Sequence, residues 1–551
     1  MTIAETAEAE RPNETVRVIA ASSAGTAFEW YDFFIYGSLA PVIAKHFFAG
    51  VNDSTAFIFA LLTFGVGFGV RPFGAFFFGR IGDVMGRKWA FLLTVTLMGV
   101  GTVAIGLLPT YAEAGVIAPI LLITCRVIQG FALGGEYGGA AIYVAEHAPR
   151  EKRGWHTSFI QTSAALGLFA ALAIILAVRT ALGEEVFAQW GWRVPFLLSL
   201  ILVALSIYIR MSIEESPVFQ RMKEEGRLSR APYREAFLQW RNLKIVLIVL
   251  FAIMMAQGVV WYTAYFQAQF FMERVLKIDP KTVNYLLIAV TIVSALQYCF
   301  FGWLSDHIGR KPVLLFGMIG AVLTFYPGFV WLTEAANPAL AAAMARAPVT
   351  IMADPSDCAL QFDPVGKHQF TSSCDIAKSV LATAGVSYRN EKAAPGSLAH
   401  VTVGGTQIES FNGTALDSKA LKEPRGAFET RLKAMLAEAG YPAKADPAGI
   451  DKLKVFGILL MFMTFATALY GPQAAALVEL FPCHIRYTAL SVPYHIGTGW
   501  FGGFLPAIAF AVVAETGSIF AWIWYPVIVG TIAAVLCLLF IPETRHRDIH
   551  I

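Results

Sequence analysis

The first apolar segment of the chain carries two acidic residues that are able to move a proton. Glu29 and Asp32 are three positions apart, and Tyr36 follows four positions later. At helical spacing these side chains share one face. Two neighbouring carboxylates do not easily ionise together, which favours the protonated form of one of them. We expect Glu29 or Asp32 to carry a coupled proton; the alternative is that they pair with Arg71 or Arg126 and only join helices.

Arg126 is the residue that we expect to bind an anionic substrate. It lies about ten residues into its apolar segment, roughly 15 Å along a helix and close to the middle of a bilayer. A guanidinium stays charged and offers a planar pair of donors to a carboxylate. The alternative is a permanent ion pair with Glu29 or Asp32. Glu136, in a glycine-rich stretch of the same segment, is a further candidate for proton coupling, or only a helix-pairing residue.

Other polar side chains within apolar segments are candidates for the lining of a substrate cavity. A single polar tip in such a segment is more often an interhelical hydrogen bond, and a single histidine more often has a structural role. The predicted lining residues besides Arg126 are Tyr36, Gln161, Gln257, Tyr262, Tyr494 and His495.

Membrane helices must hold these residues. Of the 551 residues, 56% are hydrophobic and only 15% are charged, whereas soluble domains carry about 25% charged residues. The net charge of +3 gives no reason to expect nucleic-acid binding. A spanning helix needs about 20 apolar residues. Twelve stretches qualify, and all are too long for barrel strands: 18–44, 56–79, 88–108, 116–145, 156–178, 190–209, 243–268, 283–304, 312–333, 453–477, 486–514 and 519–541.

The distribution of basic residues sets the expected orientation. The first 17 residues are polar and do not look like a cleaved signal peptide. Lys and Arg gather in alternate loops, above all between Arg210 and Lys244, so we expect both termini in the cytoplasm. The predicted domains are a first six-helix half (1–209), a cytoplasmic linker (210–242), three helices of a second half (243–333), an insertion (334–452), and the last three helices with a short tail (453–551).

Two motifs occur once in each half. Gly79–Lys88 and Gly302–Lys311 both read G-x-x-x-D-x-x-G-R-K, and E-x-x-P-x-x-x-R begins at both Glu146 and Glu479. An aspartate in such a loop is able to accept hydrogen bonds from helix N-termini or from a neighbouring arginine, which would hold the cytoplasmic ends together in one state. The predicted gating residues are Asp83, Arg87, Asp306, Arg310, Arg153 and Arg486.

The second half contains an insertion of about 110 residues, because the copies of the second motif lie that much farther apart than the copies of the first. The segment 334–452 is polar and contains no spanning stretch. We expect a small periplasmic α+β domain, with a disulfide between Cys358 and Cys374. Val401 and Val403 predict a strand, and 425–439 predicts an amphipathic helix.

The duplicated motif resembles the signature of the major facilitator superfamily. More narrowly, the chain resembles the metabolite:proton symporters, the group of α-ketoglutarate, citrate, shikimate and proline/betaine permeases. This resemblance implies an all-α membrane fold of twelve helices in two pseudo-repeats, and uptake by rocking of the halves. It covers all the expected helices but not the insertion. The residues that carry it are Glu29–Phe34 with Tyr36 and Gly37, Arg71-Pro72, Arg126 with Gln129-Gly130, Gly134–Gly139, Glu215–Phe219, Phe481-Pro482 and Pro542–Thr544.

The expected function is proton-coupled import of a small organic metabolite, a mono-, di- or tricarboxylate, across the inner membrane. A zwitterion such as betaine or proline is the alternative within this class, which the lack of a long coiled-coil tail after the last helix disfavours. A membrane sensor that uses the insertion without transporting is the alternative of another class. We expect a monomer with no enzyme activity, no cofactor and no metal, and the sequence leaves open whether a periplasmic partner binds the insertion.

Overall fold

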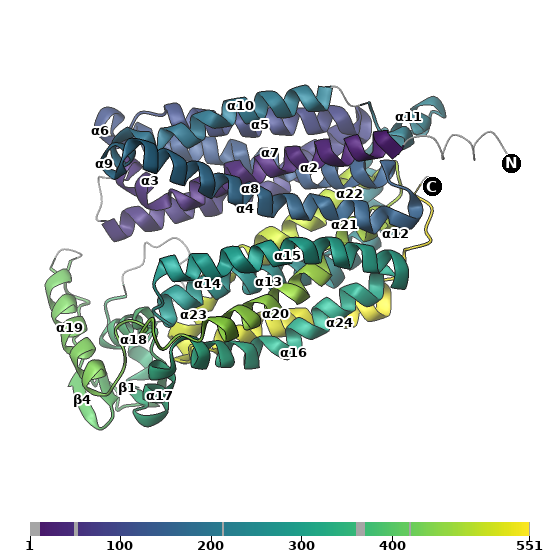
Figure 1. The fold of residues 1–551 in the computed structure, drawn as a ribbon. Coiled ribbons are helices and arrows are strands. Elements are labelled where there is room, and N and C mark those ends of the chain that lie inside the picture. Colours follow the sequence, from purple (N-terminus) through teal and green to yellow (C-terminus); the bar gives the residue numbers. More distant parts are fainter. Residues whose placement is uncertain (1–11, 49–52, 212–213, 360–369, 418–419, 550–551) are drawn as a thin grey trace.

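Long helices make up most of the protein. The structure, a computed structural model, describes residues 12–48, 53–211, 214–359, 370–417 and 420–549. Within this described part, ten helical runs are long and apolar enough to cross a membrane. Helices α2 (Pro12–Ser38) and α4 (Asp53–Val84) are two further long helices, of 27 and 32 residues. The helices form two bundles that lie against each other (Figure 1).

The first bundle consists of α2 to α10. Besides α2 and α4 it contains α3 (Ala40–Phe47), α5 (Arg87–Leu107), α6 (Tyr111–Ala114), α7 (Ile117–His147), α8 (Arg153–Leu182), α9 (Glu184–Val186) and α10 (Arg193–Met211). Glycines bring α7 and α4 close together, since a Cβ at Gly130 or Gly134 would overlap the backbone of α4 at Gly67 or Arg71. Small residues allow such approach where no hydrophobic effect drives helices together.

The second bundle contains helices that depart from α-helical periodicity. One continuous run holds α12 (Trp240–Val249), α13 (Met255–Tyr262) and α14 (Ala268–Phe270), separated and ended by π-helical η4 (Leu250–Met254), η5 (Thr263–Gln267) and η6 (Phe271–Val275). Wider π turns rotate the side chains that follow them and often mark functional sites. The bundle is completed by α15 (Pro280–Ile308), α16 (Arg310–Ala336), α20 (Lys452–Tyr470), α21 (Gln473–Leu480), α22 (Arg486–Ile496), π-helical η8 (Gly497–Gly502), α23 (Leu505–Thr516) and α24 (Trp524–Phe540).

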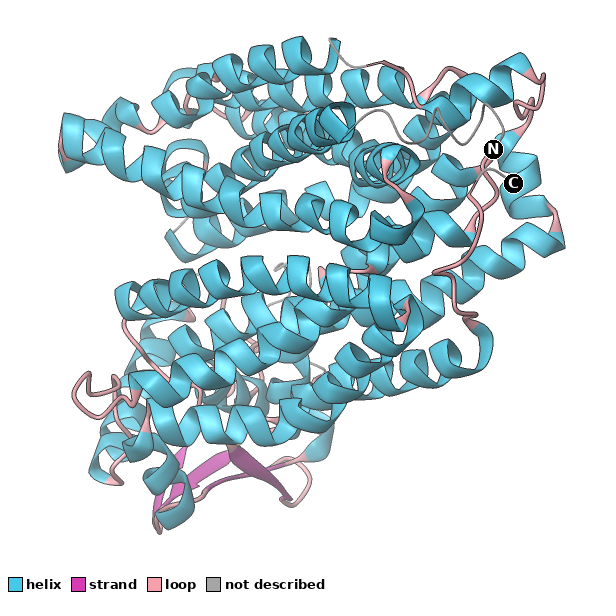
Figure 2. Ribbon diagram, turned by 45° about the vertical axis from the view of Figure 1, so that its right-hand side comes forward, coloured by secondary structure: helices cyan, strands magenta, loops and turns pink. Residues whose placement is uncertain are grey.

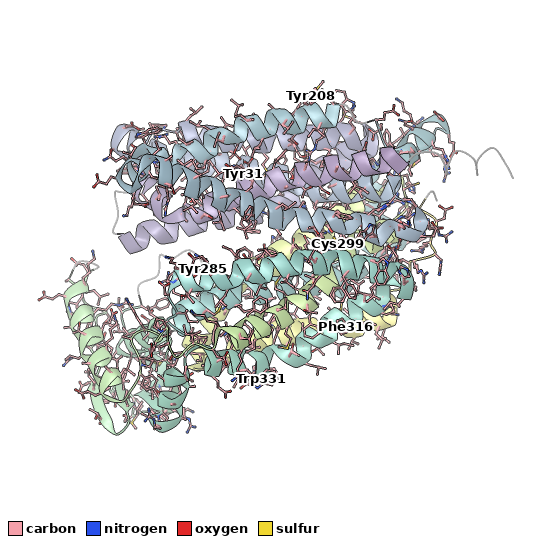
Figure 3. All side chains as sticks on the ribbon, in the orientation of Figure 1. Tyr31, Tyr208, Tyr285, Cys299, Phe316 and Trp331 are labelled. Atoms are coloured by element: carbon pink, nitrogen blue, oxygen red, sulfur yellow. A yellow bond between two sulfur atoms is a disulfide. The ribbon has the colours of Figure 1, made fainter. Side chains whose placement is uncertain are left out.

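The outer surface of both bundles is apolar, as a lipid-facing surface must be. Tyr208 and Trp331 point outward (Figure 3), and 74% and 49% of their surfaces are exposed. Tyr31, by contrast, is fully buried inside the first bundle. The apolar residues outside therefore cover the bundle, while polar residues are enclosed.

The linker between the halves holds α11 (Pro217–Glu224) and π-helical η3 (Arg234–Leu238). It lies at one end of the molecule, called the linker end below, and the strands lie at the other end, the insertion end (Figures 1 and 2). The predicted start of the linker at 210 is wrong, because Arg210 belongs to the last turn of α10 and its side chain is only 2% exposed. Because Arg210 borders a basic loop, its burial is not evident from the positions of the basic residues alone.

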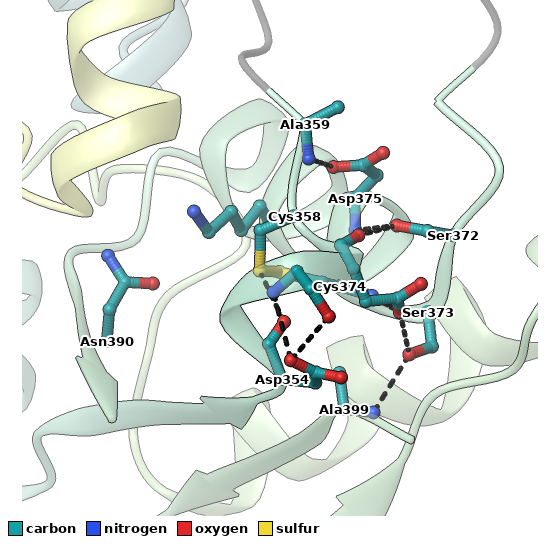
Figure 4. Close-up of a disulfide and its surroundings, with 12 residues drawn as sticks. Asp354, Cys358, Ala359, Ser372, Ser373, Cys374, Asp375, Asn390 and Ala399 are labelled. Carbon is teal, nitrogen blue, oxygen red and sulfur yellow. Dashed lines mark hydrogen bonds between the residues drawn. A yellow bond between two sulfur atoms is a disulfide. The ribbon is translucent and has the colours of Figure 1, made fainter. Parts of the chain in front are cut away.

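The inserted segment folds into a compact α/β unit between α16 and α20. Its helices are α17 (Pro338–Arg346), α18 (Ser373–Ala384) and α19 (Lys422–Glu438), with 3-10 helix η7 (Pro355–Asp357). Strands β1 (Val349–Ala353), β2 (Tyr388–Lys392), β3 (His400–Val403) and β4 (Thr406–Glu409) pair in the order β2-β1-β3-β4, and only β1–β2 is parallel. Strand β3 and helix α19 lie where the sequence predicts them, and a disulfide joins Cys358 to Cys374 (Figure 4).

The insertion is docked on loops of the second bundle. The Tyr388 N–H donates to the Gly517 carbonyl over 2.7 Å, and the Ala445 N–H donates to the Lys277 carbonyl over 3.0 Å. The Asn390 side chain donates to the Glu515 carbonyl over 3.0 Å. In the described part of the chain, the hydrogen bonds and ion pairs that the insertion makes with the bundles all reach the second one. The insertion and this bundle are therefore fastened together.

Candidate transport site

A cavity lies between the two bundles and encloses about 660 Å³ of empty space, part of it open to solvent. Both halves contribute to its wall, which is the position expected for the substrate site of a transporter. The first half contributes Thr26, Glu29, Trp30, Phe33, Arg71, Leu133, Glu136 and Tyr137, and the second contributes Gln257, Trp261, Tyr262, Tyr470, Tyr494, His495 and Thr498.

Aromatic rings form much of this wall. Tyr137 and Tyr494 stack with ring centroids 3.7 Å apart, and the hydroxyls of Tyr470 and Tyr494 are 2.6 Å apart. Trp30 and Trp261 come from opposite halves, and their ring centroids are 6.5 Å apart. Such walls bind the apolar body of a small organic molecule, and their faces also attract cations.

Three charged side chains line the cavity: Arg71, Glu29 and Glu136. The Arg71 guanidinium lies over the Phe68 ring, 4.2 Å from its centroid. Arg71 Nε, Glu136 Oε1 and Gln257 Oε1 are buried without a hydrogen-bond partner within the described ranges. The wall of the cavity thus contains one donor and two acceptors that make no hydrogen bond to described residues.

The partner of Glu29 is neither Arg71 nor Arg126 but Arg210, which was predicted to begin the linker. Arg210 Nη2 lies 3.2 Å from Glu29 Oε1 and 4.0 Å from Glu136 Oε1. The alternative pairing of Glu29 with Arg71 or Arg126 is therefore wrong. The available signal in the sequence was an arginine in the last apolar turn before a basic loop. A charged side chain inside a membrane costs free energy, which argues for a partner.

Asp32 takes part in a separate hydrogen-bond chain. Ser199 Oγ and Thr102 Oγ1 donate to its carboxylate over 2.6 and 3.0 Å. Gln129 Nε2 donates to Thr102 Oγ1 over 2.7 Å, and Arg126 Nη1 donates to Gln129 Oε1 over 2.8 Å. Asp32 makes no ion pair with any described residue, so its alternative pairing with Arg71 or Arg126 is also wrong. The chain nevertheless connects Asp32 to Arg126 through two neutral side chains.

The predicted lining residues fall into two groups. Gln257, Tyr262, Tyr494 and His495 line the cavity. Arg126, Tyr36 and Gln161 are absent from its wall: the Arg126 guanidinium lies 4.2 Å from the centroid of the Tyr36 ring, and Gln161 Nε2 donates to the hydroxyl of Tyr137 over 2.9 Å. The cation that faces the cavity is Arg71, which was not among the predicted lining residues.

Two aspartates join the halves at the linker end. Asp83 of α4 accepts from the N–H groups of Tyr487 and Thr488, at 3.1 and 2.9 Å, in the first turn of α22. Asp306 of α15 accepts from the N–H groups of Gly154 and Trp155, at 2.9 and 2.7 Å, in the first turn of α8. Each carboxylate thus binds a helix N-terminus of the opposite half, where the helix dipole favours a negative charge.

Buried ion pairs also cross between the halves at this end, and others beside them lie within one half. Arg486 binds Glu146 at 2.7 Å, and Arg153 binds Glu479 at 3.0 Å. Arg310 binds Asp306 and Glu479, at 2.6 and 3.2 Å, while Arg87 lies 3.7 Å from Asp83. All six predicted gating residues therefore meet at the linker end. Glu146 and Glu479, which the sequence showed only as part of the repeat, are the acceptors at the centre of this network.

The tail after α24 also enters the network. Thr544 Oγ1 donates to Glu479 Oε2 over 2.7 Å, and Arg486 Nη2 donates to the Ile549 carbonyl over 2.7 Å. Glu543 accepts from the N–H groups of Arg310 and Lys311 at the start of α16. At the start of α5, Glu215 of the linker does the same for Arg87 and Lys88. The structure therefore holds the two halves together at the linker end.

The chain is similar to membrane transporters over most of its helices. The family model "Sugar (and other) transporter" matches residues 17–236 and 432–550, and "MFS/sugar transport protein" matches 143–354. A proline/betaine transporter of Salmonella typhimurium is 35% identical over 324 residues, which are 57% of this chain and 64% of the relative. The shikimate transporter of Escherichia coli is 36% identical over 319 residues, 57% of this chain and 72% of the relative.

A solved structure has the same fold. The proton:xylose symporter XylE of E. coli superposes with a TM-score of 0.62 at 15% identity, covering 98% of each chain. At this identity the likeness concerns the fold alone. The family models cover more than half of the chain, with their gap at the insertion, and they agree with the two-bundle architecture and the duplicated motifs. The chain belongs to the sugar (and other) transporter family of the major facilitator superfamily.

Proposed function

We propose that this protein is a proton-coupled symporter that imports a small organic metabolite bearing a carboxylate. The observation that carries the proposal is the cavity between the halves, where Arg71 lies among aromatic rings and two carboxylates face the same space. An arginine offers a carboxylate two parallel donors. Titratable acids beside the substrate supply a place for the coupled proton.

The proposed cycle is alternating access. The linker end faces the cytoplasm, and the insertion faces the periplasm; α2 and α4 complete twelve spans. With the linker end closed, a proton enters from outside and neutralises Glu29 or Asp32, and the substrate binds. The halves then rock about the cavity and open the linker end. Each charge moved is worth about 2.3 kcal/mol per 100 mV, enough for roughly 50-fold accumulation.

Arg126 acts behind the cavity wall in this proposal. Its hydrogen-bond chain through Gln129 and Thr102 ends on Asp32. When Asp32 takes up a proton, its carboxyl no longer needs two donors, and Thr102 is free to turn. The change reaches Arg126 through Gln129, so that Arg126 responds to protonation and adds its charge to the substrate site in a later state of the cycle.

A zwitterion is the second candidate substrate. Relatives of the chain are named as proline/betaine transporters. Glu136 Oε1 and Gln257 Oε1, which have no hydrogen-bond partner among the described residues, suit a cationic nitrogen, as does the aromatic wall, while Arg71 suits the carboxylate of the same molecule. A sensor that does not transport is less well supported, because the hydrogen bonds between the halves at the linker end suit a contact that opens and closes during transport.

Uptake into proteoliposomes distinguishes these candidates. Radiolabelled shikimate, proline and glycine betaine are offered separately, with and without an inward proton gradient. Gradient-dependent uptake of shikimate supports the acid carrier, and uptake of the other two supports the zwitterion carrier. If none of a broad panel of organic acids and zwitterions accumulates, the transport proposal is wrong.

A further inference from the structure

One buried cation is shared by the two carboxylates of the cavity. Arg210 Nη2 donates to Glu29 Oε1 over 3.2 Å, while Glu136 Oε1 is 4.0 Å away and has no hydrogen bond among the described residues. Arg210 Nε is unpartnered there as well. Because a hydrogen bond to a carboxylate is about 2.9 Å long, a movement of about 1 Å would transfer the guanidinium from Glu29 to Glu136.

Contacts with two other helices hold the Arg210 guanidinium beside both acids. Its guanidinium lies 3.5 Å from the centroid of the Phe91 ring on α5, and its Nη1 donates to the Phe91 carbonyl over 3.2 Å. On α2, Gly25 lies one turn before Glu29, and a Cβ at this position would overlap Arg210 Nη2. Gly25 therefore leaves the space in which the guanidinium reaches the acids.

The charges of one set of residues, Glu29, Glu136 and Arg210, explain why a shared cation matters. Glu29, Glu136 and Arg210 together carry a net charge of −1, and Arg71 is a further cation in the wall of the same cavity. A buried charge without a close partner is costly. One proton on either acid makes the set neutral, and the guanidinium then pairs with the other acid. Asp32 on α2 and Tyr487 on α22 face Glu29 or Arg210. The other charged or titratable residues in the wall of the same cavity are Arg71, Tyr137, Tyr262, Tyr470, Tyr494 and His495.

We propose that Arg210 is a positioning residue for proton coupling, which moves between Glu29 and Glu136 as one proton is loaded and released. This role rests on the proposed proton-coupled transport. Tyr487 links the set to the gate, since its N–H donates to Asp83 and its hydroxyl donates to the carbonyl of Gly135, next to Glu136. The protonation state of the acids is thereby connected to the contact between the halves.

Gly25→Ala tests the role without removing a charge. The added methyl displaces the guanidinium, and net proton-driven uptake should fall by about tenfold, the effect of losing about 1.4 kcal/mol of pairing. Counterflow, the exchange of labelled for unlabelled substrate at equal pH, does not require the proton to leave and should stay within about twofold of wild type. Gly69→Ala is the matched control, because a Cβ at Gly69 meets nothing within 4 Å.

Arg210→Lys provides the second variant, since lysine keeps the positive charge but lacks the planar pair of donors of the guanidinium. We expect the same loss of net uptake with counterflow retained, and Gly25→Ala should add little in this background because both changes act on one contact. Equal loss of net uptake and counterflow in both variants would show a merely structural role and overturn the proposal, as would a Gly25→Ala protein that transports like Gly69→Ala. Wild-type uptake that needs no proton gradient would instead overturn the proposed function itself.

Discussion

Removal of the Asp83 charge should open the linker end. Asp83 accepts from two N–H groups of α22 and lies beside Arg87. In Asp83→Asn the amide keeps one acceptor oxygen and loses the charge, so one N–H group of α22 loses its partner. Hydrogen bonds to charged groups contribute about 1.5–3 kcal/mol each. We expect a loss of roughly 2–4 kcal/mol from the closed state, which raises the open fraction roughly 30- to 700-fold.

The native Cys483 is a reporter for this opening. Its side chain is 1% exposed and packs with Val218, Phe219 and Met222 of the linker. Burial raises the pKa of its thiol, so alkylation in the closed state is slow both because access is blocked and because little thiolate forms. The assay measures maleimide labelling of Cys483 in a protein whose Cys125, Cys299 and Cys537 are replaced by serine.

The labelling rate should rise by at least about 30-fold in Asp83→Asn, in proportion to the open population. Asp451→Asn is the matched control, since Asp451 also accepts from a helix N-terminus, the Lys454 N–H at 3.0 Å, but at the start of α20. The control should label like wild type. Unchanged labelling of Asp83→Asn would refute the reasoning that these hydrogen bonds hold the halves together.

Three further predictions concern the cavity and the insertion. Arg71→Lys loses the planar fork and should raise KM for a carboxylate substrate by about tenfold with little change in kcat, whereas Arg80→Lys, outside the cavity wall, should change neither. Cys358→Ser removes the disulfide and should lower the stability of the insertion by about 3 kcal/mol, seen as faster proteolysis of the insertion with unchanged helical circular dichroism. The backbone N–H of Gly396 lowers the pKa of Asp354 below its ordinary 3.8; the resulting stabilisation of the folded insertion is present above pH 3.8 and is lost as pH falls through the lower folded value. Asp354→Asn should therefore reduce the increase in pepsin cleavage of the insertion at low pH.

The contact between the halves at the linker end could be predicted, because the motif that makes it is local and occurs once in each half. The motif places Asp83 and Asp306 at the same position in both halves, and their partners are the first turns of helices that the second motif precedes. Composition and periodicity also placed the long apolar segments and the α+β insertion. The order of the strands was not predictable, because β1 pairs with both β2 and β3 over long stretches of chain.

The cavity wall was harder to predict, because the depth of a residue in its helix does not determine the direction in which its side chain points. Counting residues placed Arg126 close to the middle of its helix, but the face that it presents depends on how α7 packs on α4. In the structure Arg71 faces the cavity and Arg126 lies over Tyr36. Arg210 was missed for a related reason, since a basic residue at the end of a helix is ordinarily solvated. The position of its guanidinium depends on Gly25 and Phe91, which come from two other helices.

Substrate-driven proton movement in proteoliposomes tests the central claim most directly. With a substrate identified from the panel, adding it outside should make the external medium more alkaline, because protons enter with the substrate. Glu29→Gln should abolish this alkalinisation while counterflow continues. Substrate entry at an unchanged rate after the proton gradient is collapsed, with no alkalinisation in the wild type, would contradict the account.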